Sequence, residues 1–143
     1  KARFRGRRPK EKSLSKLMKE LDRVFSLYVR LIGFGNKESG LRYCYTCNHA
    51  AHYKKMQAGH FISRFYKATR WDLNNVRVQC VMCNLWRRGD PVSFRENLVE
   101  EIGEAKVRKM EKSRTKLQKL DRNILLKEIE NYKQRLSALT TKE

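Results

Sequence analysis

Acidic side chains and long apolar runs are what this sequence most clearly lacks. Aspartate and glutamate together number 15 against 34 lysines and arginines, so the 143 residues carry a formal net charge of +19. No stretch approaches the roughly 18 consecutive apolar residues of a membrane-spanning helix, which excludes that class of protein. The charged-then-apolar pattern of a secretory signal is also missing from the first residues, so we expect a cytoplasmic protein.

The excess of positive charge predicts a polyanionic partner, most simply nucleic acid. An acidic membrane surface fits less well, because the basic residues are spread along the chain and not held on one amphipathic face. Residues 43–90 carry eight basic side chains and just two carboxylates, Asp72 and Asp90. Metal chemistry in this segment must therefore use those two carboxylates or neutral ligands.

Hydrophobic periodicity divides the chain into four parts. Residues 1–12 contain seven basic side chains and one acidic side chain and predict a basic flexible tail. Residues 13–35 place apolar side chains at helical spacing behind Ser13 and predict one long amphipathic helix. Residues 43–90 are loop-rich, with short strands expected at 56–62 and 76–79 and a short helix at 83–88. Residues 91–143 predict a C-terminal helical region.

That C-terminal region contains three expected helices. The first starts at Asp90-Pro91 and stops at Gly103, the second runs through Val107, and the third begins near Asp121. The apolar seam of the third helix has coiled-coil-like spacing. Packing against a neighbouring helix of the same chain would produce the same seam, so the two interpretations stay open.

The four cysteines form two pairs, Cys44 with Cys47 and Cys80 with Cys83, in the pattern C-x2-C-x32-C-x2-C. Two such knuckles complete a tetrahedral site of four thiolates, which is the preferred geometry of structural Zn2+. Two disulfides in a secreted protein are the alternative, and a basic chain without a signal argues against them. An iron–sulfur cluster is possible but not needed to explain the spacing.

Imidazole and amide side chains lie between and beside these knuckles. His60 lies in the insert, Asn75 precedes Cys80 by five residues, and Asn84 follows Cys83 directly. This His…Asn…Asn order resembles the HNH, or ββα-metal, nuclease motif. The Cys83-Asn84 pair resembles the endonuclease VII branch of T-even phages, which cleaves branched DNA.

A longer set of sequence segments resembles the NinG, or Rap, family of lambdoid phages. It comprises Gln57–Phe61, Arg70–Asn84, Gly89, Phe94–Leu98 and Ile102-Gly103, and it extends over roughly residues 20–140. The resemblance implies a recombination endonuclease that acts on Holliday junctions and displacement loops. The fold that we expect is α+β, with a small zinc-stapled ββα-metal centre embedded among long α-helices.

The resemblance also implies a role for each polar side chain. His60 would be the general base, because a neutral imidazole can take a proton from water near pH 7. Asn75 would orient His60, and Asn84 would help to bind a catalytic Mg2+ or Mn2+. A purely structural role stays open for all three, with Asn75 as a turn residue and Asn84 as a helix cap. His49 and His52 lack any partner pattern and are expected to be structural.

One position departs from the motif. Many HNH proteins place an aspartate directly before the base histidine as a second metal ligand, and this chain has Gly59 there. Asp72, three residues before Asn75, is the nearest acidic candidate for binding the catalytic cation. Asp90 is the poorer candidate, because six residues beyond Asn84 puts it off that helix face.

Arginines surround the motif and are expected to bind DNA phosphates, because the segment offers them few carboxylate partners. These are Arg64, Arg70, Arg77, Arg87 and Arg88. Aromatic side chains interleave with them, namely Phe65, Tyr66, Trp71 and Trp86. They can stack on unpaired bases at a junction or pack around zinc, and for Trp71 we favour packing.

The sequence therefore predicts a structure-selective, metal-dependent endonuclease that cleaves branched DNA inside a bacterial host. Two other interpretations stay open: a non-catalytic zinc module that binds nucleic acid, and a sequence-specific HNH nuclease. A four-way junction has two strands to cut, so two active sites are useful. The apolar stripes of the first and last helices suit a homodimer that would supply them.

Overall fold

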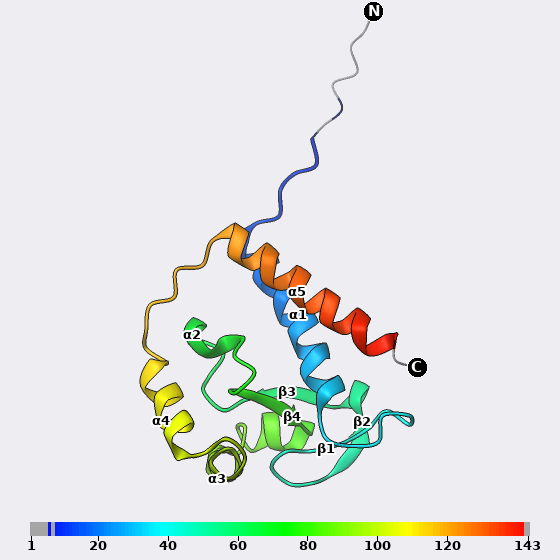
Figure 1. The fold of residues 1–143 in the computed structure, drawn as a ribbon, viewed down its shortest axis with the longest axis vertical. Helices are drawn as coiled ribbons and strands as arrows, with labels where there is room; N and C mark the ends of the chain where they lie inside the picture. Colours follow the sequence, from blue (N-terminus) through cyan, green and yellow to red (C-terminus); the bar gives the residue numbers. More distant parts are fainter. Residues whose placement is uncertain (1–5, 7, 142–143) are drawn as a thin grey trace, which may run out of the picture.

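The computed structural model describes residue 6 and residues 8–141, and it has the expected mixed α+β fold (Figure 1). The helices are α1 (Leu14–Ile32), α2 (Lys67–Arg70), α3 (Pro91–Ile102), α4 (Glu104–Ser113) and α5 (Arg122–Thr140). The strands are β1 (Leu41–Tyr43), β2 (Ala50–His52), β3 (Gln57–His60) and β4 (Val76–Gln79). Two single turns of helix, η1 (Tyr53–Lys55) and η2 (Met82–Trp86), complete the chain order.

Helix α1 matches the long amphipathic helix predicted from the sequence. The Ser13 hydroxyl accepts a hydrogen bond from the Lys16 N–H at 3.3 Å and caps its start. The side chain of Arg42 is buried and donates to the carbonyls of Arg30 and Leu31 at the other end. This arginine supplies donors for two of the carbonyls that the last turn leaves unpaired, and it ties β1 to the helix.

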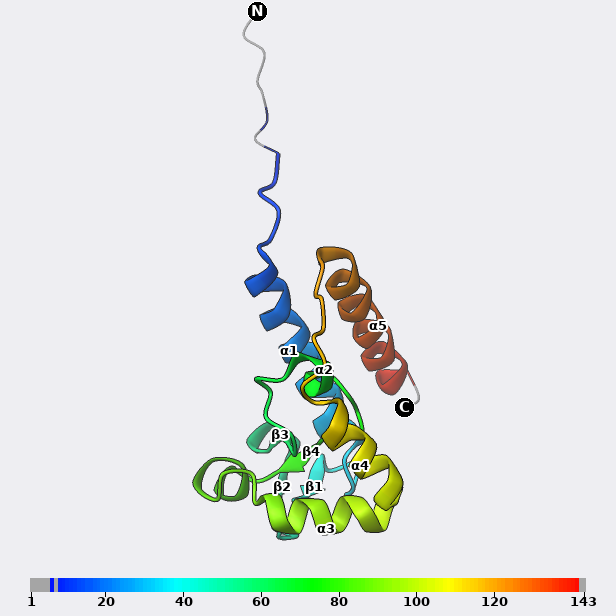
Figure 2. The ribbon, with the colours of Figure 1, turned by 90° about the vertical axis from the view of Figure 1, so that its left-hand side faces the viewer.

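The apolar stripes of α1 and α5 cover each other within one chain. The two helices run side by side in the same direction (Figures 1 and 2). Their shared core consists of Leu17, Leu21, Val24, Phe25, Val29, Val76, Leu125, Ile129 and Tyr132. The rings of Phe25 and Tyr132 meet edge to face at 5.1 Å. The apolar stripes from which a homodimer was expected are therefore buried against each other within one chain. They give no support to a dimer.

Two antiparallel hairpins form the centre of the fold. β1 pairs with β2 so that Leu41 faces His52, and β3 pairs with β4 so that His60 faces Val76. The β3–β4 hairpin is followed directly by η2, which lies at the edge of the molecule in Figure 2. Val76 brings β4 into the core of α1 and α5. The second hairpin is therefore packed against α1.

Helices α3 and α4 form a separate small core below the hairpins. It contains Ile62, Phe94, Leu98, Val107 and Met110. Asp90 precedes α3 as expected, but its side chain makes no capping hydrogen bond and its backbone is left-handed, with φ of 47°. The sequence pattern thus placed the helix start correctly, although the Asp90 side chain does not cap it.

The expected tail, residues 1–12, lies partly outside the described residues. Its described end contacts the helices: the Lys12 ammonium lies 2.7 Å from a Glu20 carboxylate oxygen, and the Arg122 guanidinium lies 3.7 Å from Glu11. No helix among the described residues is long and apolar enough to cross a membrane.

Candidate functional site

The four cysteines converge on one point, as their spacing predicts. Cys44 and Cys47 come from the turn of the β1–β2 hairpin, Cys80 directly follows β4, and Cys83 lies in η2. All four sulfur atoms lie within 4.8 Å of one another. The 3.7 Å between the sulfurs of Cys47 and Cys80 is close to the ~3.8 Å edge of a tetrahedron with zinc–sulfur bonds of about 2.3 Å. The cluster therefore fits a structural zinc ion.

Burial acts against ionisation of these thiols when they are without metal. It raises the pKa of Cys83 to about 12. The same desolvation acts on Cys44, but hydrogen bonds from Thr46 and from the Cys80 backbone outweigh it and lower the pKa to about 6. A cation that binds thiolates removes the cost of the buried charges. Metal binding would thereby stabilise the join between the two hairpins.

A cleft of about 720 Å³ opens between α1, the loop after β3 and η2. Its walls include His60 at the end of β3 and Asn84 of η2, which the chain separates by 24 positions. Cationic side chains complete the walls, namely Lys19, Arg23, Arg64 and Arg88. The fold thus brings a histidine and an amide together in a basic cleft.

One ring nitrogen of His60 is fixed by the backbone. Its Nε2 lies 2.8 Å from the carbonyl oxygen of Arg70. A carbonyl oxygen only accepts, so Nε2 carries the hydrogen and Nδ1 is the basic atom of the neutral ring. No described residue hydrogen-bonds to Nδ1. Burial first, and then the charge of Arg64, lower the pKa of His60 below its usual value near 6.5, so the ring is neutral at pH 7.

Asn75 is fully buried and lies behind this histidine. Its Oδ1 accepts from the Ile62 N–H at 2.7 Å, and its Nδ2 donates to the carbonyls of Ile62 and Thr69, both at 3.0 Å. These three hydrogen bonds tie the two ends of the loop of residues 61–74 together, directly after His60 at the end of β3. Asn75 does not line the cleft, so its geometry is that of a positioning residue.

Asn84 presents one free atom to the cleft. Its Nδ2 donates to the Gln57 Oε1 at 2.7 Å, while its Oδ1 accepts no hydrogen bond from the described residues. An amide oxygen is a ligand that hard divalent cations accept. Asn84 is therefore held in a fixed orientation with an oxygen left for a cation or a donor group.

Packing explains why position 59 holds glycine. A Cβ atom there would lie 1.9 Å from the side-chain oxygen of Gln79. Gln79 is buried and donates its amide hydrogens to the Thr46 hydroxyl at 3.1 Å and to the Gly89 carbonyl at 2.9 Å. The second acid of the HNH motif thus has no room in this hairpin.

The structure does not bring Asp72 to the cleft. Its carboxylate accepts from the Asn74 N–H at 2.9 Å and closes a local turn. The carboxylate in the cleft is Asp22 of α1, which the sequence reasoning missed. Asp22 accepts from the Arg70 Nε at 3.0 Å and from the Trp71 indole at 2.9 Å, so it is already paired.

A signal for the α1 wall was present in the sequence. Lys19, Asp22, Arg23 and Ser26 recur at intervals of three and four, which places them on one face of α1 beside the apolar stripe. Such a face is ordinarily solvated. Only its position opposite β3 and η2 marks it as part of a site.

The five arginines expected at DNA fall into two groups. Arg64 and Arg88 line the cleft, and Arg87 is also exposed. Arg70 and Arg77 have side chains that are only 13% and 16% exposed, and they pair with Asp22 and Glu101. The expectation that the arginines lack internal partners is therefore wrong for these two, because α1 and α3 supply the carboxylates that their own segment lacks.

Comparison with known protein families gives a match over the whole chain. The family described as "Bacteriophage Lambda NinG protein" matches the chain over residues 1–143. No match was found among curated proteins, and none among solved structures. Because the family match spans the whole sequence, this chain belongs to the bacteriophage lambda NinG family.

Proposed function

We propose that this protein is a metal-dependent endonuclease that hydrolyses phosphodiester bonds of branched DNA. The observation that carries the proposal is the state of His60. Its Nε2–H is committed to the Arg70 carbonyl, its pKa is lowered by burial, and its Nδ1 is left as an acceptor in a cationic cleft. A general base needs that combination of a free basic nitrogen and a neutral ring at working pH.

The surrounding side chains suit a phosphate group. Lys19, Arg23, Arg64 and Arg88 line the cleft, and its one carboxylate is neutralised by Arg70. These cations can hold a DNA strand and offset charge that develops on the phosphate. The imidazole Nδ1 then takes the proton of the attacking water, and the Arg70 carbonyl keeps the ring oriented during the transfer.

Asn84 is the residue that would hold a divalent cation. Its free Oδ1 is a suitable donor, and Gln57 fixes the amide in place. When bound, Mg2+ or Mn2+ supplies Lewis-acid stabilisation of the phosphate and of the leaving oxygen. Because the cleft offers this one unpaired amide oxygen and a paired Asp22, water and phosphate oxygens would complete the shell. We therefore expect weak cation binding without DNA.

The test is cleavage of a four-way junction and of a linear duplex of the same sequence, with and without Mg2+ or Mn2+. We expect His60→Ala to abolish junction cleavage while junction binding and zinc content stay unchanged, because neither phosphate contacts nor zinc use this ring. His49→Ala is the matched control, since that histidine is exposed and does not line the cleft.

The outcomes separate the three interpretations. If His60→Ala cuts junctions at the wild-type rate, the assignment of the base is wrong. Wild-type protein that binds junctions but cuts no DNA would be a non-catalytic zinc module. Equal cutting of the junction and the duplex at one sequence would identify a sequence-specific nuclease. Loss of cutting in Asn84→Ala that is partly restored by excess cation would support its role as a ligand.

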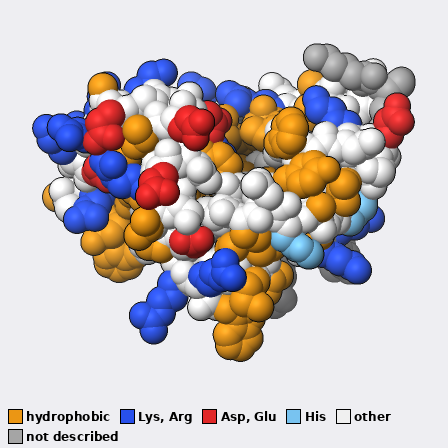
Figure 3. Space-filling view, turned by 90° about the horizontal axis from the view of Figure 1, so that it is seen from below, with side chains coloured by type: hydrophobic (Ala, Val, Ile, Leu, Met, Phe, Trp, Pro, Cys, Tyr) orange, Lys and Arg blue, Asp and Glu red, His pale blue; other side chains and the backbone are white. Residues whose placement is uncertain are grey.

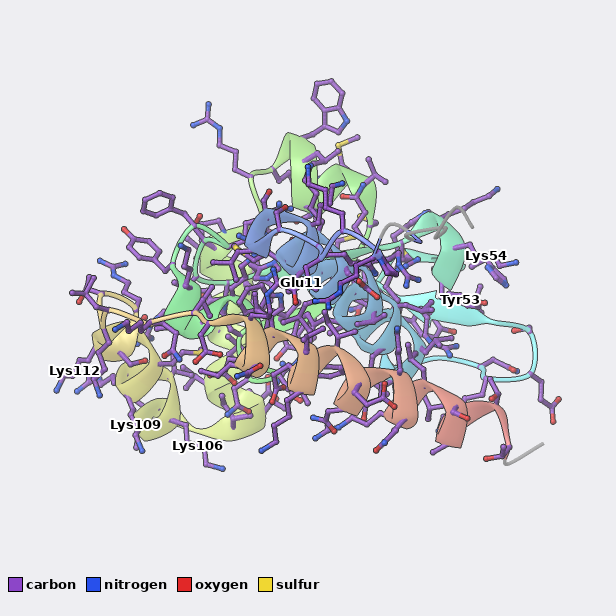
Figure 4. The ribbon with its side chains drawn as sticks, turned by 90° about the horizontal axis from the view of Figure 1, so that it is seen from above. Glu11, Tyr53, Lys54, Lys106, Lys109 and Lys112 are labelled. Carbon is purple, nitrogen blue, oxygen red and sulfur yellow. The ribbon has the colours of Figure 1, made fainter. Side chains whose placement is uncertain are left out.

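A charge-matched comparison tests the location of the DNA site. Lys106, Lys109 and Lys112 project from α4 on the side of the molecule away from η2 (Figure 4). Replacing Arg64 and Arg88 by Gln should weaken DNA binding more than replacing Lys106 and Lys109 by Gln, although both pairs of changes remove two charges. Equal losses would show that binding depends on net charge and not on the cleft.

A further inference from the structure

Two large aromatic side chains stand in solvent beside the cleft. Trp86 of η2 is 77% exposed, and Phe65 of the loop after β3 is 80% exposed. Leu85 and Met82, also of η2, are 58% and 54% exposed. Figure 3 shows hydrophobic side chains protruding as a knob at the edge of the molecule where η2 lies, next to Lys or Arg side chains. Folding alone gives no reason to expose so much apolar surface in one place.

The exposed side chains of η2 are carried by a backbone of unusual geometry. Its hydrogen bonds span five and six residues, from the Arg87 N–H to the Met82 carbonyl at 2.9 Å and from the Gly89 N–H to the Cys83 carbonyl at 2.8 Å. Three successive residues, Arg88, Gly89 and Asp90, then adopt positive φ of 52°, 84° and 47°. Left-handed backbone at non-glycine residues is costly and persists only where surroundings hold it.

The surroundings that hold η2 are buried. Cys83 lies in the cluster of four cysteines and is fully buried, and Gln79 donates to the Gly89 carbonyl at 2.9 Å. Trp86 follows Cys83 by three residues. The exposed indole of Trp86 is thus carried on a turn that is fixed at both ends. The backbone of this turn is already ordered, so binding a ligand costs little conformational entropy there.

Both aromatic residues adjoin walls of the cleft that contains His60. Arg64 lines the cleft and Phe65 follows it, while Leu85 lines the cleft and Trp86 follows it. The Phe65 N–H donates to the Ser63 hydroxyl at 3.2 Å, and its ring meets Tyr66 edge to face at 5.4 Å. Each exposed aromatic residue thus directly follows, in the chain, a residue that lines the cleft.

We propose that Trp86 and Phe65 stack on unpaired bases where DNA strands branch, and that this stacking gives the protein its preference for branched over linear DNA. The inference rests on the proposed function, since it names the substrate feature read by the same site. Bases stack favourably on aromatic side chains whatever their identity. In linear duplex the bases are already stacked on one another, so the rings gain this contact only at a branch.

Charge favours DNA over a second copy of the chain as the occupant. Arg64, Arg87 and Arg88 follow or precede the exposed rings in the chain. Arg64 lies 3.9 Å from the Asp22 carboxylate with its side chain 67% exposed, and Arg87 and Arg88 form no ion pair among the described residues. Two copies meeting through this surface would bring those arginines together and repel each other. A DNA strand brings phosphates to the arginines and bases to the rings at once.

The experiment uses the 143-residue chain loaded with zinc and a four-way junction with 2-aminopurine at the branch point. The matched duplex carries 2-aminopurine in its interior. Wild-type protein should change the fluorescence of the junction probe and not that of the duplex probe. Trp86→Ala and Phe65→Ala should each abolish or reduce the junction signal and weaken junction binding by roughly 5- to 150-fold, the range expected for one base stacked on one ring. Duplex affinity should stay the same.

Phe34→Ala is the matched control, because Phe34 is 83% exposed and does not line the cleft. Trp86→Phe should keep part of the signal, which shows that an aromatic face is what matters. Wild-type junction affinity in Trp86→Ala and Phe65→Ala would overturn the inference, as would an equal loss of duplex affinity. Because the readout is fluorescence and binding, it stands even if the wild-type protein cuts no DNA, so failure of the nuclease proposal is recognised separately.

Discussion

Replacing Asn75 by alanine tests how the loop that follows His60 is held. The change removes three hydrogen bonds, one from the Ile62 N–H and two to the carbonyls of Ile62 and Thr69. At about 1 kcal/mol for each buried bond, the free energy of unfolding should fall by about 3 kcal/mol. That is a large share of the roughly 5–15 kcal/mol by which a domain is stable.

The assay is urea unfolding of the zinc-loaded protein, with the slope compared between variants so that a change in the unfolded state is recognised. Asn74→Ala is the control, because Asn74 is exposed and its side chain forms no hydrogen bond with the described residues. A loss below about 1 kcal/mol for Asn75→Ala would refute the reasoning, since a single bond of ordinary strength would then exceed it.

The same variant has a second readout that a merely stabilising residue would not move. If Asn75 keeps the loop closed over His60, the imidazole of Asn75→Ala becomes more exposed and its pKa rises toward 6.5, because burial is the main cause of its lowering. NMR titration of the ring protons measures this directly. An unchanged pKa would show that Asn75 holds the loop without positioning the histidine.

Further predictions concern pH, metal, packing and charge. Since the pKa of His60 is lowered, the unfolded chain takes up its proton first as the pH falls below 6.5, so the free energy of unfolding should fall on that side and stay level above it. Junction cleavage should fall only at lower pH, where the ring of the folded protein itself takes up the proton. Cys80→Ser should lose metal and unfold the hairpins, which metal analysis and circular dichroism would show. Gly59→Asp should destabilise the fold by about 2 kcal/mol or more in urea unfolding, because the new Cβ meets Gln79. Removing residues 1–12, which carry seven basic and one acidic side chains, should flatten the dependence of DNA affinity on salt, measured by titration at several ionic strengths.

Local sequence patterns predicted much of the fold. The stripe of α1, the glycine after α3 and the aspartate before α5 mark helices at the places where they lie, because capping and periodicity act over a few residues. The β1–β2 hairpin was not predicted, since three-residue strands carry too little alternation to be recognised. The cysteine spacing predicted a single metal site because each knuckle is local and only one other pair exists to complete it.

The composition of the cleft was decided only by tertiary structure. Asp22 and Arg70 are 48 residues apart, so no local pattern reveals that one neutralises the other. In the folded chain Arg77 forms an ion pair with Glu101, whereas Arg64 and Arg88 line the cleft. The sequence by itself determined the long helices, the cluster of four cysteines and the candidate histidine, whose signals are short in range. Which charges stay free, whether the side-chain oxygen of Asn84 is paired and which aromatic rings stay in solvent depend on segments that meet only when the chain has folded.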